Sequence, residues 1–215
     1  MAGNRTPIEG RIHGDLPRLS AAAAAATIGE TATVLTSGFG SVGYPKAVPL
    51  ALADSDRERA LTLVSSGNVG EEIDVDLIES GAVARRFTYQ SSAVARRMTN
   101  EREIAFSDRH ASSIADEVEY GSLVDPDVAV VEAVAVGEDW FVPSTSLGQT
   151  PAFVDAAPEL VVEVNHAQPL ELQALHDVYR PGTPPNRGPI PIDDAGDRIG
   201  DAVVGFDPEK LRAVV

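Results

Sequence analysis

The chain has 215 residues, a formal net charge of −16 and no cysteine, and 43% of its residues are apolar. This length and composition suit one large domain or two small ones with a sizeable core. Without cysteine, disulfides, thiolate zinc sites and cysteine nucleophiles are excluded. A surface this acidic repels nucleic acid and anionic membranes, so neither is expected as a partner.

Targeting and membrane segments are not evident in the sequence. No apolar run reaches the length that spans a bilayer. The alanine run at residues 21–26 is too short and too weakly apolar for the core of a signal peptide. We therefore expect a soluble cytoplasmic protein.

The first half of the chain alternates short apolar runs with helical patterns. Residues 1–15 carry no clear pattern and are expected to form a loose lead-in. Strands are predicted at residues 33–36, 61–65 and 84–89. Helices are predicted at residues 20–28, 46–53, 76–80, 91–98 and 114–120. Ser91 or Ser92 is expected to cap the fourth of these helices.

The second half contains the strongest strand signal. Residues 128–136, VAVVEAVAV, are typical of a strand at the centre of a sheet that is covered on both faces. Further predicted elements are a hairpin strand at 140–143, a helix at 150–157 and a strand at 160–164. Proline and glycine at 180–208 predict an ordered arm without regular structure. The apolar run at 211–215 predicts a strand that is interrupted or handed to a partner.

Strands that alternate with short helices predict an α/β fold with a mostly parallel sheet flanked by helices. In such sheets ligands bind beyond the carboxyl ends of the strands. We call this side of the sheet the carboxyl edge. The polar segments expected there are Ser37-Gly38-Phe39, Ser66-Gly67-Asn68, Gln90-Ser91-Ser92 and Asn165-His166.

A glycine-rich loop, residues 37–43, joins the first strand to the next helix, with Pro45 placed for that helix's first turn. Glycines let the backbone turn sharply and approach a ligand, and free N–H groups there can surround an anion or a carbonyl oxygen. No G-K-[ST] follows, which excludes a P-loop. The glycine spacing matches G-x-G-x-x-G, but a clear acidic residue after a second strand is missing. On local evidence, tight packing of helix on sheet is favoured over a ligand site.

The residues that most often carry chemistry give weak signals. His13, His110, His166 and His176 lack metal-ligand spacing, so no metal site is assigned. His166 is the best functional candidate among them because it follows a buried strand, although a structural role is favoured for each. No G-x-S-x-G sequence occurs, so a serine nucleophile is not supported.

Two glutamates, Glu132 and Glu163, interrupt apolar strands. A buried carboxylate needs a partner or a raised pKa. A functional role is possible for each, but pairing with arginine or backbone donors in the core is favoured. Asp74 and Asp76, beside the glutamates at 71–72, are interpreted as a solvated acidic face.

From residue 37, SGFGSVGYPKAVP fits the S-G-F-x-x-x-G-x-P-K-x-V-P pattern of the acetyl-CoA hydrolase/acetate CoA-transferase family, which it resembles. The resemblance extends, in the family's order, over nearly the whole chain from about residue 16. The further segments that carry it are QSSAVARRMTN, FSDRHASSIADEVEYG, DVAVVEAVAVGEDWFVPSTSLGQTPAFVDAA, VVEVNHAQPLELQALHDVY, PPNRGPIPI and RIGDAVVGFDPEKLRAVV.

The resemblance implies a CoA-transferase-like α/β fold, of the type shared with sugar-phosphate isomerases, and an activity on coenzyme A thioesters. The family moves CoA between acetyl or another short acyl group and a carboxylate such as acetate or succinate, or water. No bound cofactor is implied. A glutamate attacks the thioester, and acyl-glutamyl anhydride and glutamyl-CoA intermediates follow, with an oxyanion hole.

The family's nucleophilic glutamate and its G-[IV]-G-N-V CoA loop belong to a second domain, and neither motif occurs in these residues. No catalytic residue is therefore assigned, and Glu132 is ascribed to the scaffold. We expect residues 16–215 to be the N-terminal domain or a split subunit. It would assemble with a C-terminal domain or subunit, in an oligomer, and would have no transferase activity alone.

The alternative is a truncated, catalytically inactive remnant that acts only as a binding or interaction domain. A second alternative, a sugar-phosphate isomerase-like enzyme, is weakened by the lack of a cationic phosphate cradle.

The resemblance also assigns residues of the substrate site. They belong to the glycine-rich loop and to two polar turns, where relatives often carry serine or threonine and an Asn-Thr pair. The residues expected to bind substrate are Ser37, Gly38, Phe39, Gly40, Asn68, Gln90 and Ser91.

The balance of charged residues leads to a prediction about salt. Lys46 and Lys210 are the only lysines, and the other basic residues are arginines. High acid content with little lysine resembles proteins of salt-loving organisms, although a GC-rich genome could give the same bias. Molar KCl should raise the melting temperature above its low-salt value, because salt screens repulsion between surface carboxylates. Equal melting temperatures in both would contradict this.

Overall fold

A computed structural model of the chain describes residues 8–67, 69–121, 123–182 and 184–215. Seven strands form a parallel sheet in the order β4-β3-β2-β1-β5-β7-β9. β6 runs antiparallel to the second half of β5, and β8 pairs with β6. The strands are β1 Thr33–Thr36, β2 Leu61–Ser65, β3 Val83–Phe87, β4 Ala105–Ser107, β5 Val128–Val136, β6 Trp140–Pro143, β7 Glu159–Val164, β8 Val204–Gly205 and β9 Leu211–Val214.

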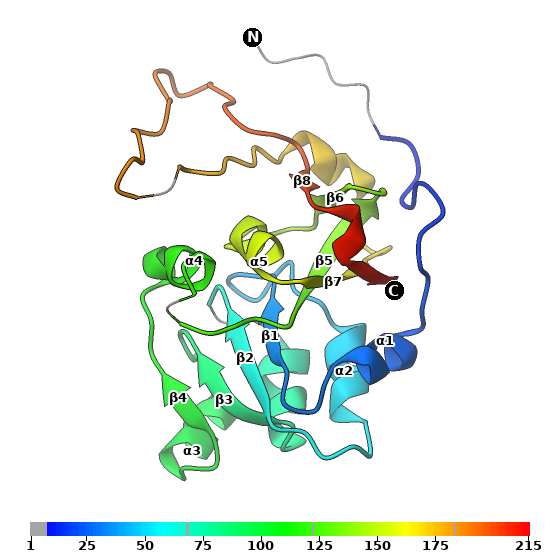
Figure 1. Cartoon of the computed structure of the whole chain (residues 1–215), viewed down its shortest axis with the longest axis vertical. Coiled ribbons are helices and arrows are strands. Elements are labelled where there is room, and N and C mark those ends of the chain that lie inside the picture. Colours follow the sequence, from blue (N-terminus) through cyan, green and yellow to red (C-terminus); the bar gives the residue numbers. More distant parts are fainter. Residues whose placement is uncertain (1–7, 68, 122, 183) are drawn as a thin grey trace.

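Helices cover both faces of the sheet (Figure 1). They are α1 Ala21–Thr27, α2 Ala47–Ala53, α3 Ala93–Asn100, α4 Ala111–Glu119 and α5 Thr150–Ala156, with a π-helical segment η1 Glu72–Leu77 and 3-10 turns Leu170–Ala174 and Pro208–Lys210. Val128 and Val130 of β5 pack toward α1, α2 and η1, whereas Ala129 and Val131 pack toward α4 and α5. This alternation follows from the two-residue period of a strand.

The predicted α/β class and the central position of β5 are confirmed. All nine residues of β5 are buried, between β1 on one side and β7 on the other. The hairpin partner β6 and the helix α5 also lie where the sequence predicted them. The near-continuous β-branched composition of β5 thus marks a strand covered on both faces.

Three expectations about elements are corrected. The helix predicted at 76–80 begins earlier, in η1, which includes the buried Asp74. The apolar run at 211–215 is not handed to a partner: it forms β9, beside β7 of the same chain. Pro45 precedes α2, which begins at Ala47, so it does not occupy the helix's first turn.

The described part of the lead-in, residues 8–15, lies along the sheet. The His13 N–H donates to the Val136 carbonyl at 2.9 Å, and the Val136 N–H donates to the Arg11 carbonyl at 2.7 Å. The Arg11 guanidinium also donates to three carbonyls, including that of Val134 at 2.9 Å. These contacts hold the segment in place, whereas a loose lead-in was expected.

The proline- and glycine-rich arm projects away from the sheet (orange in Figure 1). Its base is closed by mutual backbone hydrogen bonds between Val178 and Asp201, at 2.6 and 2.9 Å. Arg187 anchors it to Asp116 of α4 through two hydrogen bonds, the shorter of 2.5 Å. Ile190 and Ile192, farther along, are more than half exposed.

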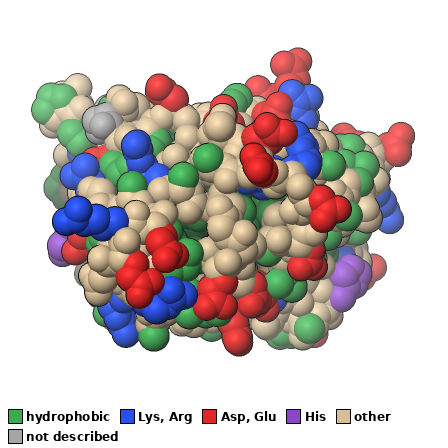
Figure 2. Space-filling model, turned by 90° about the horizontal axis from the view of Figure 1, so that it is seen from below, with side chains coloured by type: hydrophobic (Ala, Val, Ile, Leu, Met, Phe, Trp, Pro, Cys, Tyr) green, Lys and Arg blue, Asp and Glu red, His purple; other side chains and the backbone are tan. Residues whose placement is uncertain are grey.

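The face of the molecule seen in Figure 2 carries carboxylates and Lys or Arg side chains in separate groups among uncharged residues. No helix within the described ranges is long and apolar enough to cross a membrane.

Candidate functional site

Three loops meet at the carboxyl edge of the sheet. They are the glycine-rich loop after β1, the turn at 65–70 after β2 and the segment 144–149 after β6. A Cβ built on Gly67 would lie 3.2 Å from the Phe39 ring, so the ring covers this turn. On the other side, Ser66 Oγ accepts a hydrogen bond from the Gln149 N–H at 2.9 Å. The turn at 65–70 therefore contacts both of the other segments, which also contact each other at Gly43 and Ser146.

Glycine is required in the glycine-rich loop by both conformation and space. Gly38 and Gly43 have φ angles of +108° and +66°. A Cβ on Gly43 would lie 2.6 Å from Ser146, and one on Gly38 would lie 2.5 Å from the Tyr44 Cβ. Either contact is too close for a real side chain, so glycine is needed for the loops to pack together at this edge.

Backbone strain is also present at this edge. Ser41 and Thr88 have φ angles of +66° and +85°, although neither is glycine. For the β-branched Thr88, which is almost fully buried, this conformation is costly. Such strain persists only where surrounding contacts enforce it, and it tends to mark functional sites.

Ser37 has its hydroxyl inside the structure. The side chain is 1% exposed; its Oγ accepts the Glu132 N–H at 2.9 Å and donates to the Gly43 carbonyl at 2.9 Å. Ser37 therefore closes the glycine-rich loop on β5. By contrast, Phe39 is half exposed, and a Cβ built on Gly40 would have no atom within 4 Å.

The remaining residues predicted for the site differ in their exposure to solvent. Gln90 is 8% exposed, and its amide bonds the Thr99 hydroxyl of α3 at 3.1 Å. Ser91 is exposed, and the neighbouring Ser92 rather than Ser91 caps α3. His166 is exposed on the turn after β7. Asn68 lies outside the described residues.

The two glutamates that interrupt apolar strands hold the start of α2. Glu132 and Glu163 are register partners on β5 and β7, and both are buried. The Glu163 carboxylate accepts the Lys46 N–H at 2.7 Å and the Val48 N–H at 3.1 Å, which caps the helix. The expected pairing with backbone donors is confirmed for this residue.

Glu132 pairs with a lysine instead of the expected arginine or backbone donors. Its carboxylate forms an ion pair with the Lys46 ammonium and accepts a hydrogen bond from the Ser144 hydroxyl. The ammonium also donates to the Tyr44 carbonyl at 2.7 Å and lies 4.0 Å from the centre of the Tyr44 ring. Glu132 and Glu163 are thus both engaged in holding the scaffold.

A second buried ion pair overturns the interpretation of Asp74 as part of a solvated face. Asp74 is 4% exposed and accepts a hydrogen bond from Arg86 of β3 at 2.5 Å. Burial raises the pKa of Asp74, an effect that the Arg86 charge and the Val69 N–H oppose. Nearby, burial and a 2.7 Å hydrogen bond to Glu72 raise the pKa of Tyr44 well above its ordinary value.

Sequence reasoning missed Lys46, Ser144 and Arg86 as parts of this edge. Arg86 follows the exposed Arg85 within VARRF, so only strand alternation could have indicated that it points inward. Within the described ranges, no group of three or more acidic or histidine side chains is placed to hold a metal ion.

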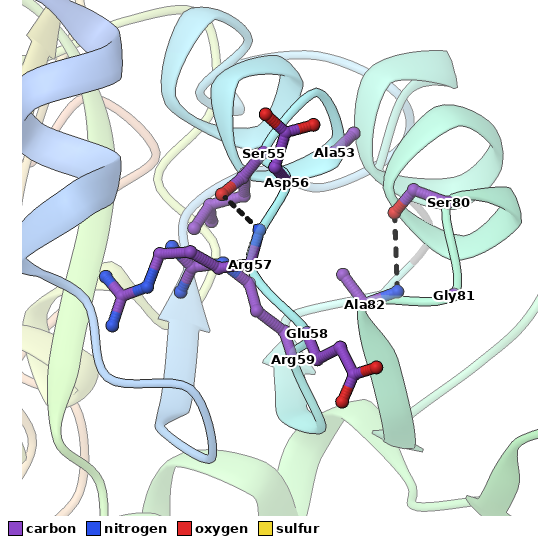
Figure 3. A pocket seen from close by; sticks show the side chains of 10 residues that line it. Ala53, Ser55, Asp56, Arg57, Glu58, Arg59, Ser80, Gly81 and Ala82 are labelled. Carbon is purple, nitrogen blue, oxygen red and sulfur yellow. Dashed lines mark hydrogen bonds between the residues drawn. The ribbon is translucent and has the colours of Figure 1, made fainter.

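A pocket of about 380 Å³ lies at the opposite edge of the sheet, before β2 and β3 (Figure 3). Its cationic residues have partners in the fold. Arg59 donates to the carbonyls of Ile28 at 2.9 Å and Ala25 at 3.1 Å, and Arg57 pairs with Glu30 at 3.1 Å. The pocket does not include the loops of the carboxyl edge.

The Lys46–Glu132 pair can be tested by removing the cation. Lys46→Met should lower the free energy of unfolding by about 2 kcal/mol, less than for a fully buried pair because the Lys46 side chain is 35% exposed. Adding Glu132→Gln should restore part of that loss, since the double variant has no unpaired buried charge. Denaturant unfolding measures both values. Additive losses in the double variant would contradict the coupling.

Comparisons with known proteins agree with this architecture. A model of the acetyl-CoA hydrolase/transferase N-terminal domain matches residues 16–215. The succinyl-CoA:acetate CoA-transferase of Clostridium kluyveri is 40% identical over 85% of this chain, and the propanoyl-CoA:succinate CoA transferase of Escherichia coli is 35% identical over 92%. The chain spans 35% and 42% of the lengths of these two relatives.

A solved structure shares the fold at low sequence identity. The glutaconate coenzyme A-transferase of Acidaminococcus fermentans superposes with a TM-score of 0.56 and 14% identity, over 72% of this chain and 67% of that one. Because the family model covers nearly the whole chain and the curated relatives exceed 30% identity, the chain belongs to the acetyl-CoA hydrolase/transferase family and contains its N-terminal domain.

Proposed function

We propose that this chain forms the acyl- and carboxylate-binding wall of a CoA-transferase or acetyl-CoA hydrolase site, completed by a second domain or subunit. The observation that carries the proposal is the meeting of the glycine-rich loop with the turn at 65–70 at the carboxyl edge. The buried carboxylates nearest these loops, Glu132 and Asp74, are both engaged in ion pairs. We therefore propose that the nucleophilic carboxylate comes from the other polypeptide.

The substrate class follows from the relatives. Their names describe exchange of CoA between succinyl or propanoyl groups and acetate or succinate, so short acyl-CoA thioesters and small carboxylates are the proposed substrates. The thioester is a substrate here, and no bound cofactor is part of the proposal. The working enzyme is proposed to be an oligomer in the cytoplasm.

The candidate residues are proposed to have different roles. Ser37 would act through the loop, since its hydroxyl is already bonded to the Glu132 N–H and the Gly43 carbonyl. The backbone from Gly38 to Gly40 and the Phe39 ring would face the acyl group. From the family resemblance, Asn68 and Ser91 would supply polar groups toward the carboxylate, whereas Gln90, whose amide bonds the Thr99 hydroxyl, would act by holding the segment before α3.

When the second polypeptide attacks the thioester, negative charge develops on the carbonyl oxygen. Prearranged donors lower that barrier because they need no reorganisation. The packed glycines and strained residues fix the backbone of this edge before substrate arrives. The chain would therefore orient the substrate and exclude water, while the second polypeptide would supply the nucleophile and the contacts to CoA.

The division of labour predicts that the purified chain alone does not exchange CoA between acetyl-CoA and succinate. Adding a polypeptide that carries the nucleophilic glutamate and the G-[IV]-G-N-V loop, such as the product of an adjacent reading frame, should produce exchange. The acetyl-CoA/succinate assay measures both. Turnover by the chain alone would contradict the division, and inactivity of the complex would favour a domain that only binds.

The site residues can be tested in the active complex. Asn68→Ala and Ser91→Ala should each raise the KM for the carboxylate by about tenfold, as expected from the loss of a hydrogen bond to a charged group. Ser112→Ala, an exposed serine on α4, serves as the control and should leave KM unchanged. Wild-type KM values in both site variants would remove these residues from the site.

A further inference from the structure

A buried ion pair lies beneath the turn at 65–70. Arg86 comes from β3 and is 0% exposed, while Asp74 comes from η1, just after the turn. Their Nη2 and Oδ1 atoms are 2.5 Å apart. The pair therefore joins a strand to the helix that the turn leads into.

Both ends of the turn are tied to this pair. Asp74 Oδ2 accepts the Val69 N–H at 2.8 Å. Arg86 Nη2 donates to Ser65 Oγ at 3.3 Å, and Ser65 Oγ donates to the Gly67 carbonyl at 2.6 Å. One carboxylate and one guanidinium thus bind the turn at Val69 and at Ser65.

The turn at 65–70 contacts the other loops of the carboxyl edge. Gly67 lies under the Phe39 ring, and Ser66 Oγ accepts a hydrogen bond from the Gln149 N–H. Ser41 Oγ also donates to the Val69 carbonyl at 3.3 Å. A shift of the turn would therefore disturb its contacts with both the glycine-rich loop and the 144–149 segment.

Stability alone does not account for the pair. Desolvating two charges offsets much of their attraction, and apolar residues of similar volume often stabilise a core as well. In addition, Nε and Nη1 of Arg86 have no hydrogen-bond partner within the described ranges. An incompletely satisfied, fully buried guanidinium is a cost that needs another explanation.

We propose that the Asp74–Arg86 pair is a positioning device, which fixes the turn at 65–70 so that the carboxyl edge keeps its geometry. Its effect on substrate rests on the proposed function, because the turn contains the candidate residue Asn68. Directional hydrogen bonds from the pair to the turn are what apolar replacements could not supply.

Arg59 offers a matched control. It is 9% exposed and, like Arg86, has an Nε without a partner within the described ranges. However, it lies at the opposite edge and donates to backbone carbonyls at the end of α1. Arg59→Met therefore removes a buried arginine without touching the turn.

The first measurement uses the chain alone. Asp74→Leu/Arg86→Met should speed amide hydrogen exchange at Val69 and its neighbours in the turn at least tenfold, while β5 keeps its wild-type exchange. Arg59→Met should leave the turn unchanged. If the double variant does not fold, Ser65→Ala, which removes the link from Arg86 to Gly67 together with a 3.4 Å contact to the Thr88 hydroxyl, must still speed exchange in the turn. Wild-type exchange at 65–70 in the folded variant tested would overturn the proposal.

The second measurement uses the active complex with the complementing polypeptide. The double variant should raise the KM for the carboxylate at least tenfold, and Arg59→Met should leave KM unchanged even where it lowers the melting temperature. An unchanged KM in the double variant would overturn the link to substrate. A wild-type complex without activity would count against the proposed function, whereas the exchange result would still decide whether the pair positions the turn.

Discussion

Two buried carboxylates bind the first turn of α2 and the residue before it. The arrangement of the loops at the carboxyl edge depends on these contacts. Glu132 and Glu163 are adjacent on parallel strands and therefore face the same side of the sheet. One holds the Lys46 side chain and the other holds backbone N–H groups of Lys46 and Val48. Because Ser37 is bonded to the Glu132 N–H, the glycine-rich loop is fixed to one place on β5 at both of its ends.

The chain's two lysines show what this contact demands. Lys46 binds a carboxylate and a backbone carbonyl, and Lys210 donates to the carbonyls of Val154 and Asp155 at 3.0 and 2.8 Å. An ammonium directs three donors from one compact centre, so each lysine binds two oxygens of the fold with its Nζ atom alone. Arg11 likewise binds three carbonyls, but it spreads them over its two terminal nitrogens.

Sequence periodicity predicted the elements whose own residues are mostly apolar. It did not predict burial where a residue depends on a partner that is distant in the sequence. The pattern of β5 predicts its central position, and glutamates inside such strands predict buried partners. Asp74 stands in EEIDVD, which has the composition of a surface, and its burial depends on where β3 places Arg86. β4 has only three residues and is a strand because β3 lies beside it. Likewise, the parallel-strand rule predicted the edge, but not that Ser37 turns its hydroxyl inward.

Three large apolar side chains are exposed to water at the same edge. Phe39, Val42 and Tyr89 are 50%, 45% and 59% exposed, although the loops that carry them are fixed from beneath by buried hydrogen bonds. Large apolar groups held in water on strained, well-fixed loops suit a surface that another body covers. If a second polypeptide covers them, water is excluded around a carboxylate nucleophile and electrostatic contacts with the developing charge strengthen. The rigidity of this chain and the chemistry proposed for its partner are then two requirements of one site.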